Sequence, residues 1–159
     1  MGHSARRFLT AIAILAIALF SDVGTASAGT TPSFEAHVLG PVLIDHRDPS
    51  LAYVQARYVC DEAPAWHLWV SIKQNASGTQ DQFLDQEHSS QVATTWLQTH
   101  PTTLTCDGTW QVQRFTLDTL EQGFGEALNG VGWFQFCLID FADESFQRAV
   151  IIQEWRSVR

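Results

Sequence analysis

The sequence predicts an all-β protein: an antiparallel, immunoglobulin-like β-sandwich of about seven or eight strands that follows an N-terminal signal peptide. Three observations support this fold class. Apolar and polar residues alternate over several short segments, which is the spacing of half-buried strands. Turn-forming dipeptides such as Asp-Gly and Asn-Gly separate these segments. No segment has the periodicity of an amphipathic helix, so helical folds are disfavoured.

The first 28 residues have the three parts of a secretory signal peptide. Arg6 and Arg7 are the positive region, residues 8–20 are an apolar run, and Ala26-Ser27-Ala28 is a small-residue cleavage site. The run is shorter than the ~20 residues of a transmembrane helix. We therefore expect Sec-type export, cleavage after Ala28, and a secreted, extracellular chain without membrane insertion, in which residues 29–159 form a single domain.

The mature chain is strongly acidic. Without the leader it keeps 7 basic and 16 acidic residues, a net charge of −9, and Lys73 is its one lysine. Such a surface repels phosphate backbones, so no nucleic-acid partner is expected. An unknown protein or glycan is the expected partner, and we expect the chain to be a monomer.

The strands follow one another along the mature chain. Residues 34–45 predict an edge strand that bends at Gly40-Pro41, and residues 51–60 a strand with Val54, Ala56 and Tyr58 on one face. The clearest alternation is in residues 66–74, where Leu68, Val70 and Ile72 alternate with Trp69, Ser71 and Lys73. Residues 75–91 are polar and predict a long loop.

The second half of the chain continues the pattern. The expected strands are residues 92–98, 102–106, 110–117, 130–141 and 148–158, and Asp107-Gly108 predicts a tight hairpin between the second and the third of these. The segment Gly130–Phe141 is apolar at both parities, with Phe134, Phe136 and Leu138 opposite Trp133 and Cys137. Such a strand belongs in the interior of a sheet, so we expect it to be the central strand.

Three cysteines lie in the mature chain, and export permits a disulfide. Cys60 ends a predicted strand and Cys106 opens a turn, which favours a Cys60–Cys106 bridge. The alternative is Cys60–Cys137, which would join facing sheets as in immunoglobulin domains. The remaining cysteine is expected to be a buried thiol.

Several of these segments together resemble a family. They are Ala56–Cys60, His67–Gln74, Thr105–Thr109, Gly123–Gly125 and Trp133–Leu138. In this order they are similar to a group of small secreted actinobacterial proteins that is catalogued as a domain of unknown function, and the resemblance covers about residues 53–138. It implies an exported bacterial β-sandwich domain, and it implies no catalytic or binding residue.

Catalytic and cofactor motifs are weak in this chain. There is no Gly-x-Ser-x-Gly elbow, and Gly123-Phe124-Gly125 lacks the third glycine of a nucleotide fingerprint. The histidines have no metal-ligand spacing, and the acidic turn near Asp140 is typical of a solvated loop. We therefore expect no enzyme activity, no cofactor and no metal.

The tryptophans are the strongest functional signal. Alternation places Trp69 on the face opposite Leu68, Val70 and Ile72, and Trp66 and Trp110 lie next to turns. Exposed tryptophans stack on sugar rings or anchor protein partners, whereas the alternative is that they pack under the loop of residues 75–91. The candidate binding residues are Trp66, Trp69, Trp96 and Trp110. The sequence thus predicts a secreted binding module, with a carbohydrate-binding module and a small hydrolase as alternatives.

Overall fold

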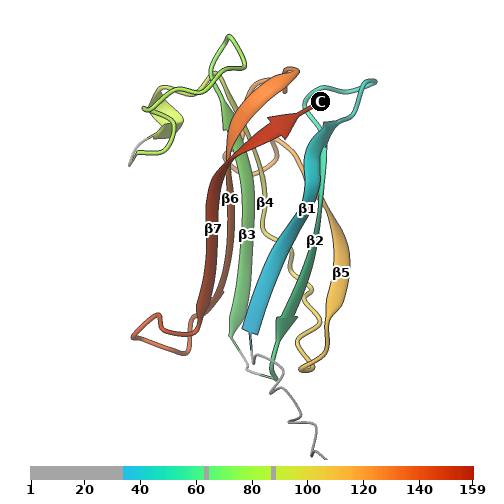
Figure 1. Ribbon diagram of the computed structural model, residues 1–159, viewed down its shortest axis with the longest axis vertical. Coiled ribbons are helices and arrows are strands. Elements are labelled where there is room, and N and C mark those ends of the chain that lie inside the picture. Colours follow the sequence, from blue (N-terminus) through green and yellow to red (C-terminus); the bar gives the residue numbers. More distant parts are fainter. Residues whose placement is uncertain (1–33, 63–64, 87–88) are drawn as a thin grey trace, which may run out of the picture. The chain divides into compact units, whose positions relative to one another are not determined.

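The computed structural model describes residues 34–62, 65–86 and 89–159, and this part of the chain is built from seven strands (Figure 1). They are β1 (Phe34–Ile44), β2 (Ala52–Cys60), β3 (Trp66–Gln74), β4 (Thr95–Thr99), β5 (Gln111–Leu117), β6 (Gly130–Asp140) and β7 (Ala149–Val158), with one 3-10 turn, η1 (Ser89–Gln91), before β4. The all-β class is confirmed. The predicted signal peptide, residues 1–28, lies outside the described residues. Within the described ranges, no helix has the length and apolarity needed to span a membrane.

The strands form one mixed sheet in the order β4-β3-β6-β7-β1-β2-β5. In Figure 1, β7, β6, β3 and β4 lie on one side and β1, β2 and β5 on the other. All neighbours pair antiparallel except β1 and β7, which meet in parallel at Val42 and Val158. The wholly antiparallel pairing expected from the sequence is therefore not confirmed.

The parallel pair arises from an irregularity in β1. The pairing of β1 with β2 shifts register between Leu39 and Leu43, where Gly40 has a φ of 69°. Within this irregular stretch Val42 reaches β7, and the Arg159 amide donates to the Val42 carbonyl over 3.0 Å. The strand was expected at a sheet edge, and this is wrong: β1 pairs with β2 on both sides of the bulge and with β7 at Val42, so it lies between them.

The two outer strands also approach each other. Isolated antiparallel bridges join Gln98 to Asp118 and Trp96 to Phe124, so the segment after β5 lies along β4. The two sides of the sheet are thus connected twice: by the pairing of β1 with β7, and by these bridges between β4 and the segment after β5. The sheet therefore curls nearly into a barrel. This leaves an inner face and an outer face on every strand.

The core fills the space between the two sides. Its largest fully buried side chains alternate along the strands as the sequence predicts, and they include Tyr58, Leu68, Ile72, Leu97, Leu117, Phe134, Phe136 and Leu138. Rings from opposite sides meet at Phe115 and Phe136, whose centroids are 6.0 Å apart. Strand β6 lies between β3 and β7, which confirms its interior position.

A disulfide joins Cys60 to Cys106, as predicted. Cys137 is a free, buried thiol. The alternative Cys60–Cys137 bridge is excluded because Cys137 lies on the outer face of β6, opposite Trp69, whereas Cys60 belongs to the inner core.

Residues 102–106 form no strand. Gly108 does make the predicted turn, with a φ of 76°, but β5 pairs with β2 instead of returning along residues 102–106. Two contacts hold this segment at the end of β2: the disulfide joins Cys106 to Cys60, and the Gly108 amide donates to the Cys60 carbonyl over 2.9 Å. The chain therefore enters β5 beside β2.

Candidate functional site

The outer face of β3 and β4 carries a continuous series of ring side chains. Leu68, Val70 and Ile72 point into the core, so the residues between them point outward. We call this surface the aromatic face, and it consists of Phe141, His67, His100, Trp69, Trp96 and Phe124. Sequence alternation placed Trp69 on this face.

Each ring of the aromatic face contacts the next. The centroid distances are 5.1 Å for Phe141–His67, 5.4 Å for His67–His100, 6.1 Å for His100–Trp69, 6.5 Å for Trp69–Trp96 and 6.2 Å for Trp96–Phe124. Trp69 and His100 are nearly parallel, with 8° between their planes. Such contacts hold the half-buried rings in fixed positions.

Hydrogen-bonding groups lie beside the rings. The Trp69 indole donates to the Gln98 side-chain oxygen over 3.0 Å, and Ser71 contacts Gln135 over 3.4 Å. His100 bonds to the Glu121 carboxylate. The face therefore combines apolar ring surface with amide, hydroxyl and carboxylate groups.

Burial controls protonation of His67 on the aromatic face and of Cys137 and Lys73 on the neighbouring outer surface of the sheet. Partial burial and the neighbouring His100 lower the pKa of His67, so the imidazole is neutral at pH 7. Burial raises the pKa of the Cys137 thiol to about 11, which keeps it protonated and unreactive. Burial also lowers the pKa of Lys73, whose ammonium lies 5.0 Å from the Trp96 ring and donates to Ser89.

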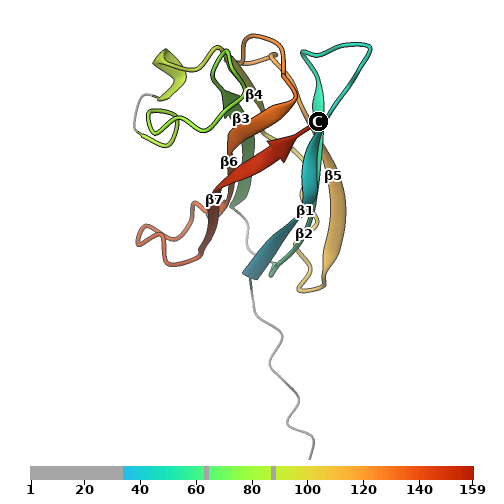
Figure 2. The ribbon, with the colours of Figure 1, turned by 45° about the horizontal axis from the view of Figure 1, so that its top comes forward.

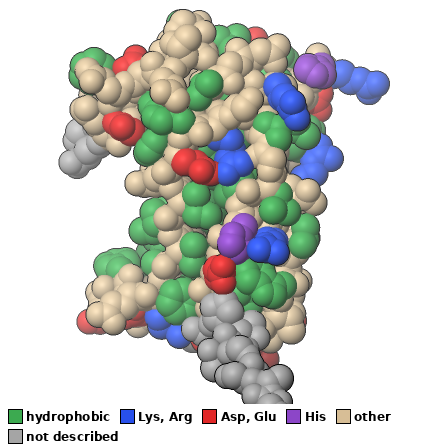
Figure 3. Space-filling model, viewed as in Figure 1, with side chains coloured by type: hydrophobic (Ala, Val, Ile, Leu, Met, Phe, Trp, Pro, Cys, Tyr) green, Lys and Arg blue, Asp and Glu red, His purple; other side chains and the backbone are tan. Residues whose placement is uncertain are grey.

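Two loops flank the aromatic face. The loop that follows β3 projects from one end of β3 and β6, and the turn between β6 and β7 projects from the other, on the same side (Figures 1 and 2). In Figure 3 the outline of the described domain is indented between these projections. Leu84 of the first loop is fully buried without belonging to the core between the two sides.

The structure brings together only two of the four predicted tryptophans, Trp69 and Trp96. Trp66 packs at the core margin, where its indole donates to the Asp61 carbonyl over 2.9 Å and the Arg148 guanidinium lies 5.3 Å from its ring. Trp110 is 39% exposed, with the Arg57 guanidinium 5.0 Å from its ring. The four rings do not form one coplanar set.

Sequence reasoning missed other residues of this surface. His67 and His100 are far apart in the chain and meet only through the pairing of β3 with β4. Trp133 and Trp155, opposite each other on β6 and β7, form a T-shaped pair with centroids 5.2 Å apart. Alternation separated Trp133 from Phe134 and Phe136, but no face was predicted for Trp155, and the register that joins the two rings depends on the pairing of β6 with β7.

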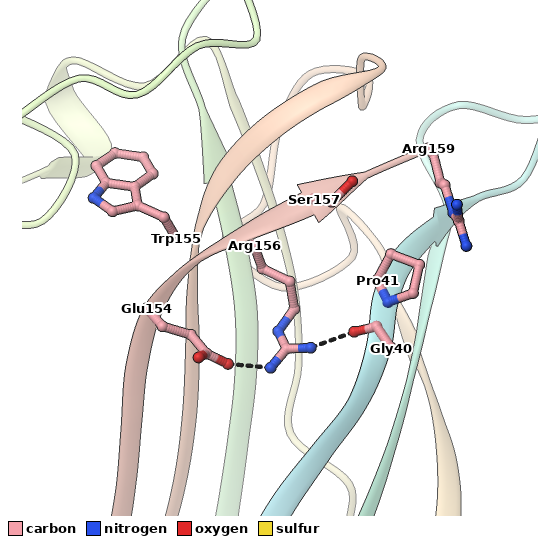
Figure 4. Close-up of a pocket in the computed structure, with 7 residues that line it drawn as sticks. All are labelled: Gly40, Pro41, Glu154, Trp155, Arg156, Ser157 and Arg159. Atoms are coloured by element: carbon pink, nitrogen blue, oxygen red, sulfur yellow. Dashed lines mark hydrogen bonds and ion pairs between the residues drawn. The ribbon is translucent and has the colours of Figure 1, made fainter.

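A second surface feature surrounds the bulge in β1. Three adjoining cavities of about 440, 470 and 490 Å³ share walls there, and Arg159 lines all three. In Figure 4 the Arg156 guanidinium points from β7 toward β1, between the Glu154 carboxylate and the Gly40 carbonyl, and bonds to both. The Trp155 ring points away from it. We call these cavities together the arginine groove.

Residues suited to metal binding are dispersed. Among the described residues, no three His, Cys, Asp or Glu side chains lie close enough together to hold a metal ion. Asp140 of the acidic turn accepts from the Arg148 Nε over 2.8 Å, so its carboxylate serves an ion pair.

Comparisons of this chain with protein-family models, with curated proteins and with solved structures gave no match. The candidate surfaces are therefore interpreted from their own geometry.

Proposed function

We propose that the chain is an exported, non-catalytic binding module whose ligand lies on the aromatic face. The observation that carries this proposal is the series of six contacting rings between two projecting loops, with hydrogen-bonding side chains beside them. Rings that already contact one another lose little conformational entropy when a ligand covers them.

The ligand class that suits this surface best is a carbohydrate. Sugar rings present C–H groups that pack on indole and imidazole faces, and hydroxyl groups that bond to amides and carboxylates. The partly exposed Trp69 and His100 supply the first kind of contact, and Glu121, whose side chain is 53% exposed, supplies the second.

Intrinsic tryptophan fluorescence of the mature protein tests this proposal against a panel of cell-wall and plant polysaccharides. A binding glycan changes the emission of Trp69 and Trp96 and slows migration in an affinity gel. The diagnostic variant is Ile151→Glu, because Ile151 is 57% exposed and pairs with Cys137 on the same outer face. We expect it to weaken glycan binding at least about fivefold.

The matched control is Val112→Glu. Val112 is 62% exposed and lies on β5, on the other side of the sheet from the aromatic face, so the same charge is added away from the proposed site. Equal loss in both variants would argue for a general charge effect. If no polysaccharide of the panel changes the tryptophan emission or the migration of the protein, the carbohydrate proposal is wrong.

A protein ligand is the second candidate. It is favoured by two exposed apolar side chains: Phe141 of the aromatic face, at 56%, and Ile151 of β7, at 57%, on the same outer side of the sheet. Protein interfaces concentrate such anchors in a central patch. Co-purification of one defined exported protein with wild-type, lost in Ile151→Glu and retained in Val112→Glu, would support this candidate over the glycan.

We also propose that the topology is immunoglobulin-like, in keeping with the resemblance to secreted actinobacterial proteins. The grouping of β1, β2 and β5 opposite β4, β3, β6 and β7 supports this view, and so does a core formed between the two sides. An experimental structure in which the two sides pack face to face at the angle of aligned sandwiches tests it.

A further inference from the structure

The arginine groove gathers basic side chains in an acidic domain. Of the 7 basic residues in residues 29–159, four line its cavities, namely Arg47, Arg114, Arg156 and Arg159. Only two carboxylate side chains, Asp45 and Glu154, line them as well. Residues 29–159 contain 16 acidic and 7 basic residues, and against this background the local excess of positive charge attracts anions.

Most of these guanidinium groups are available to a ligand. Arg156 is engaged with Glu154 and the Gly40 carbonyl. In the described part of the chain, the side chains of Arg47, Arg114 and Arg159 form no ion pair and donate no hydrogen bond. Arginine forks of this kind bind carboxylates through paired N–H donors.

Arg114 is held in place on the groove wall. Its guanidinium lies 3.8 Å from the Tyr53 ring centroid, and the Tyr53 hydroxyl donates to Asp45 over 2.8 Å. The Arg47 amide and then the Tyr53 hydroxyl lower the pKa of Asp45 through hydrogen bonds, so this carboxylate stays ionised. A cation fixed on a ring requires less ordering on binding than a free side chain.

The walls between the arginines are apolar. Leu39 is 36% exposed and Leu43 is 47% exposed, on either side of the bulge. The phenol ring of the groove is occupied by Arg114, and the Trp155 indole points away (Figure 4). His46 is then the one other aromatic ring in the lining, so the groove has no series of rings like the aromatic face. The adjoining cavities follow β1 instead of forming one compact pocket.

From these observations we infer that the arginine groove binds an extended, acidic segment of a protein partner. Its aspartate or glutamate carboxylates bond to Arg114 and Arg159, and its apolar side chains pack on Leu39 and Leu43. This site is separate from the aromatic face and does not depend on the function proposed for that face.

Selection from a displayed random-peptide library on the mature protein tests the inference. Counter-selection uses the double variant Arg114→Gln/Arg159→Gln, and thermal unfolding confirms that this variant is folded. We expect enriched peptides to contain several Asp or Glu residues alternating with aliphatic residues. Their affinity, measured by fluorescence anisotropy, should fall about tenfold or more in the double variant, because two charge-assisted bonds are lost.

Two controls define the site. Arg57→Gln removes an arginine that lies over Trp110, outside the groove, and should change affinity by less than about twofold, as expected for a distant surface charge. Ile151→Glu should also leave peptide binding unchanged, which separates this site from the aromatic face. Selected peptides without acidic residues, or an equal loss in Arg57→Gln, would overturn the inference. Oligogalacturonate that binds more tightly than the peptides, and loses affinity in the double variant, would overturn it in favour of an anionic glycan.

Discussion

The disulfide between Cys60 and Cys106 gives a prediction whose magnitude follows from the chain. The two residues are 46 positions apart, and the entropy of closing such a loop in the unfolded chain corresponds to about 4 kcal/mol. Replacing both cysteines with alanine should therefore lower the free energy of unfolding by about 4 kcal/mol. For a domain of this size that is a fall in Tm of about 15 °C.

Urea unfolding followed by tryptophan fluorescence measures this difference. The double variant Cys60→Ala/Cys106→Ala is compared with wild-type, and Cys137→Ala serves as a control that removes a thiol without opening a loop. The wild-type midpoint should approach that of the double variant when the disulfide is reduced. A loss below about 1 kcal/mol would refute the loop-entropy reasoning, and it would mean that the unfolded chain without the disulfide already keeps the two segments close together.

Three further predictions concern single positions. Gly125→Ala should lower the Tm more than Gly40→Ala does. Both glycines have positive φ, but a Cβ at Gly125 would lie 2.3 Å from the Thr94 carbonyl oxygen, whereas one at Gly40 would meet nothing within 4 Å. Equal losses of Tm in the two variants would contradict this. Arg148→Met should destabilise the domain at pH 7, because the Arg148 side chain lowers the pKa of Asp61. The ion pair therefore stabilises the domain above the ordinary pKa of the carboxyl group, and this stabilisation is lost as pH falls below about 4. Urea unfolding should show that the free energies of unfolding of wild-type and Arg148→Met converge in acid, whereas a difference that is constant with pH would indicate a packing role for Arg148. The Cys137 thiol, 8% exposed and with its pKa raised to about 11, should resist a thiol reagent at pH 8 until urea unfolds the chain, and rapid labelling of the native protein would disprove its burial.

The alternation of apolar and polar residues within short segments was sufficient to predict much of the fold. Strand β3 matches the expected residues 66–74 because its alternation is regular, and β6 was recognisable from apolar residues on both parities. The disulfide followed from its place at the end of a strand. In each case the signal lies within a few neighbouring residues, and burial of apolar side chains explains it.

The missed features depend on contacts between distant segments. Alternation places Trp69 on the outer face, but His100 lies beyond the predicted strand of residues 92–98, and only the pairing of β3 with β4 brings its ring to Trp69. The arginine groove is assembled from β1, β2, β5 and β7, and its arginines are isolated in the sequence. The expected hairpin at Asp107 failed for the same reason, because β5 pairs with β2 and not with the segment before it.

The position of β7 between β6 and β1 affects how the chain folds. Strand β1 gains its second neighbour, β7, only after residue 158 has been synthesised, since Val42 pairs with Val158. Until then, β6 and the part of β1 around Val42 keep an unpaired edge, and such edges promote aggregation. Non-local pairing of this kind slows folding, so a chain interrupted before β7 should be more sensitive to protease than the whole chain.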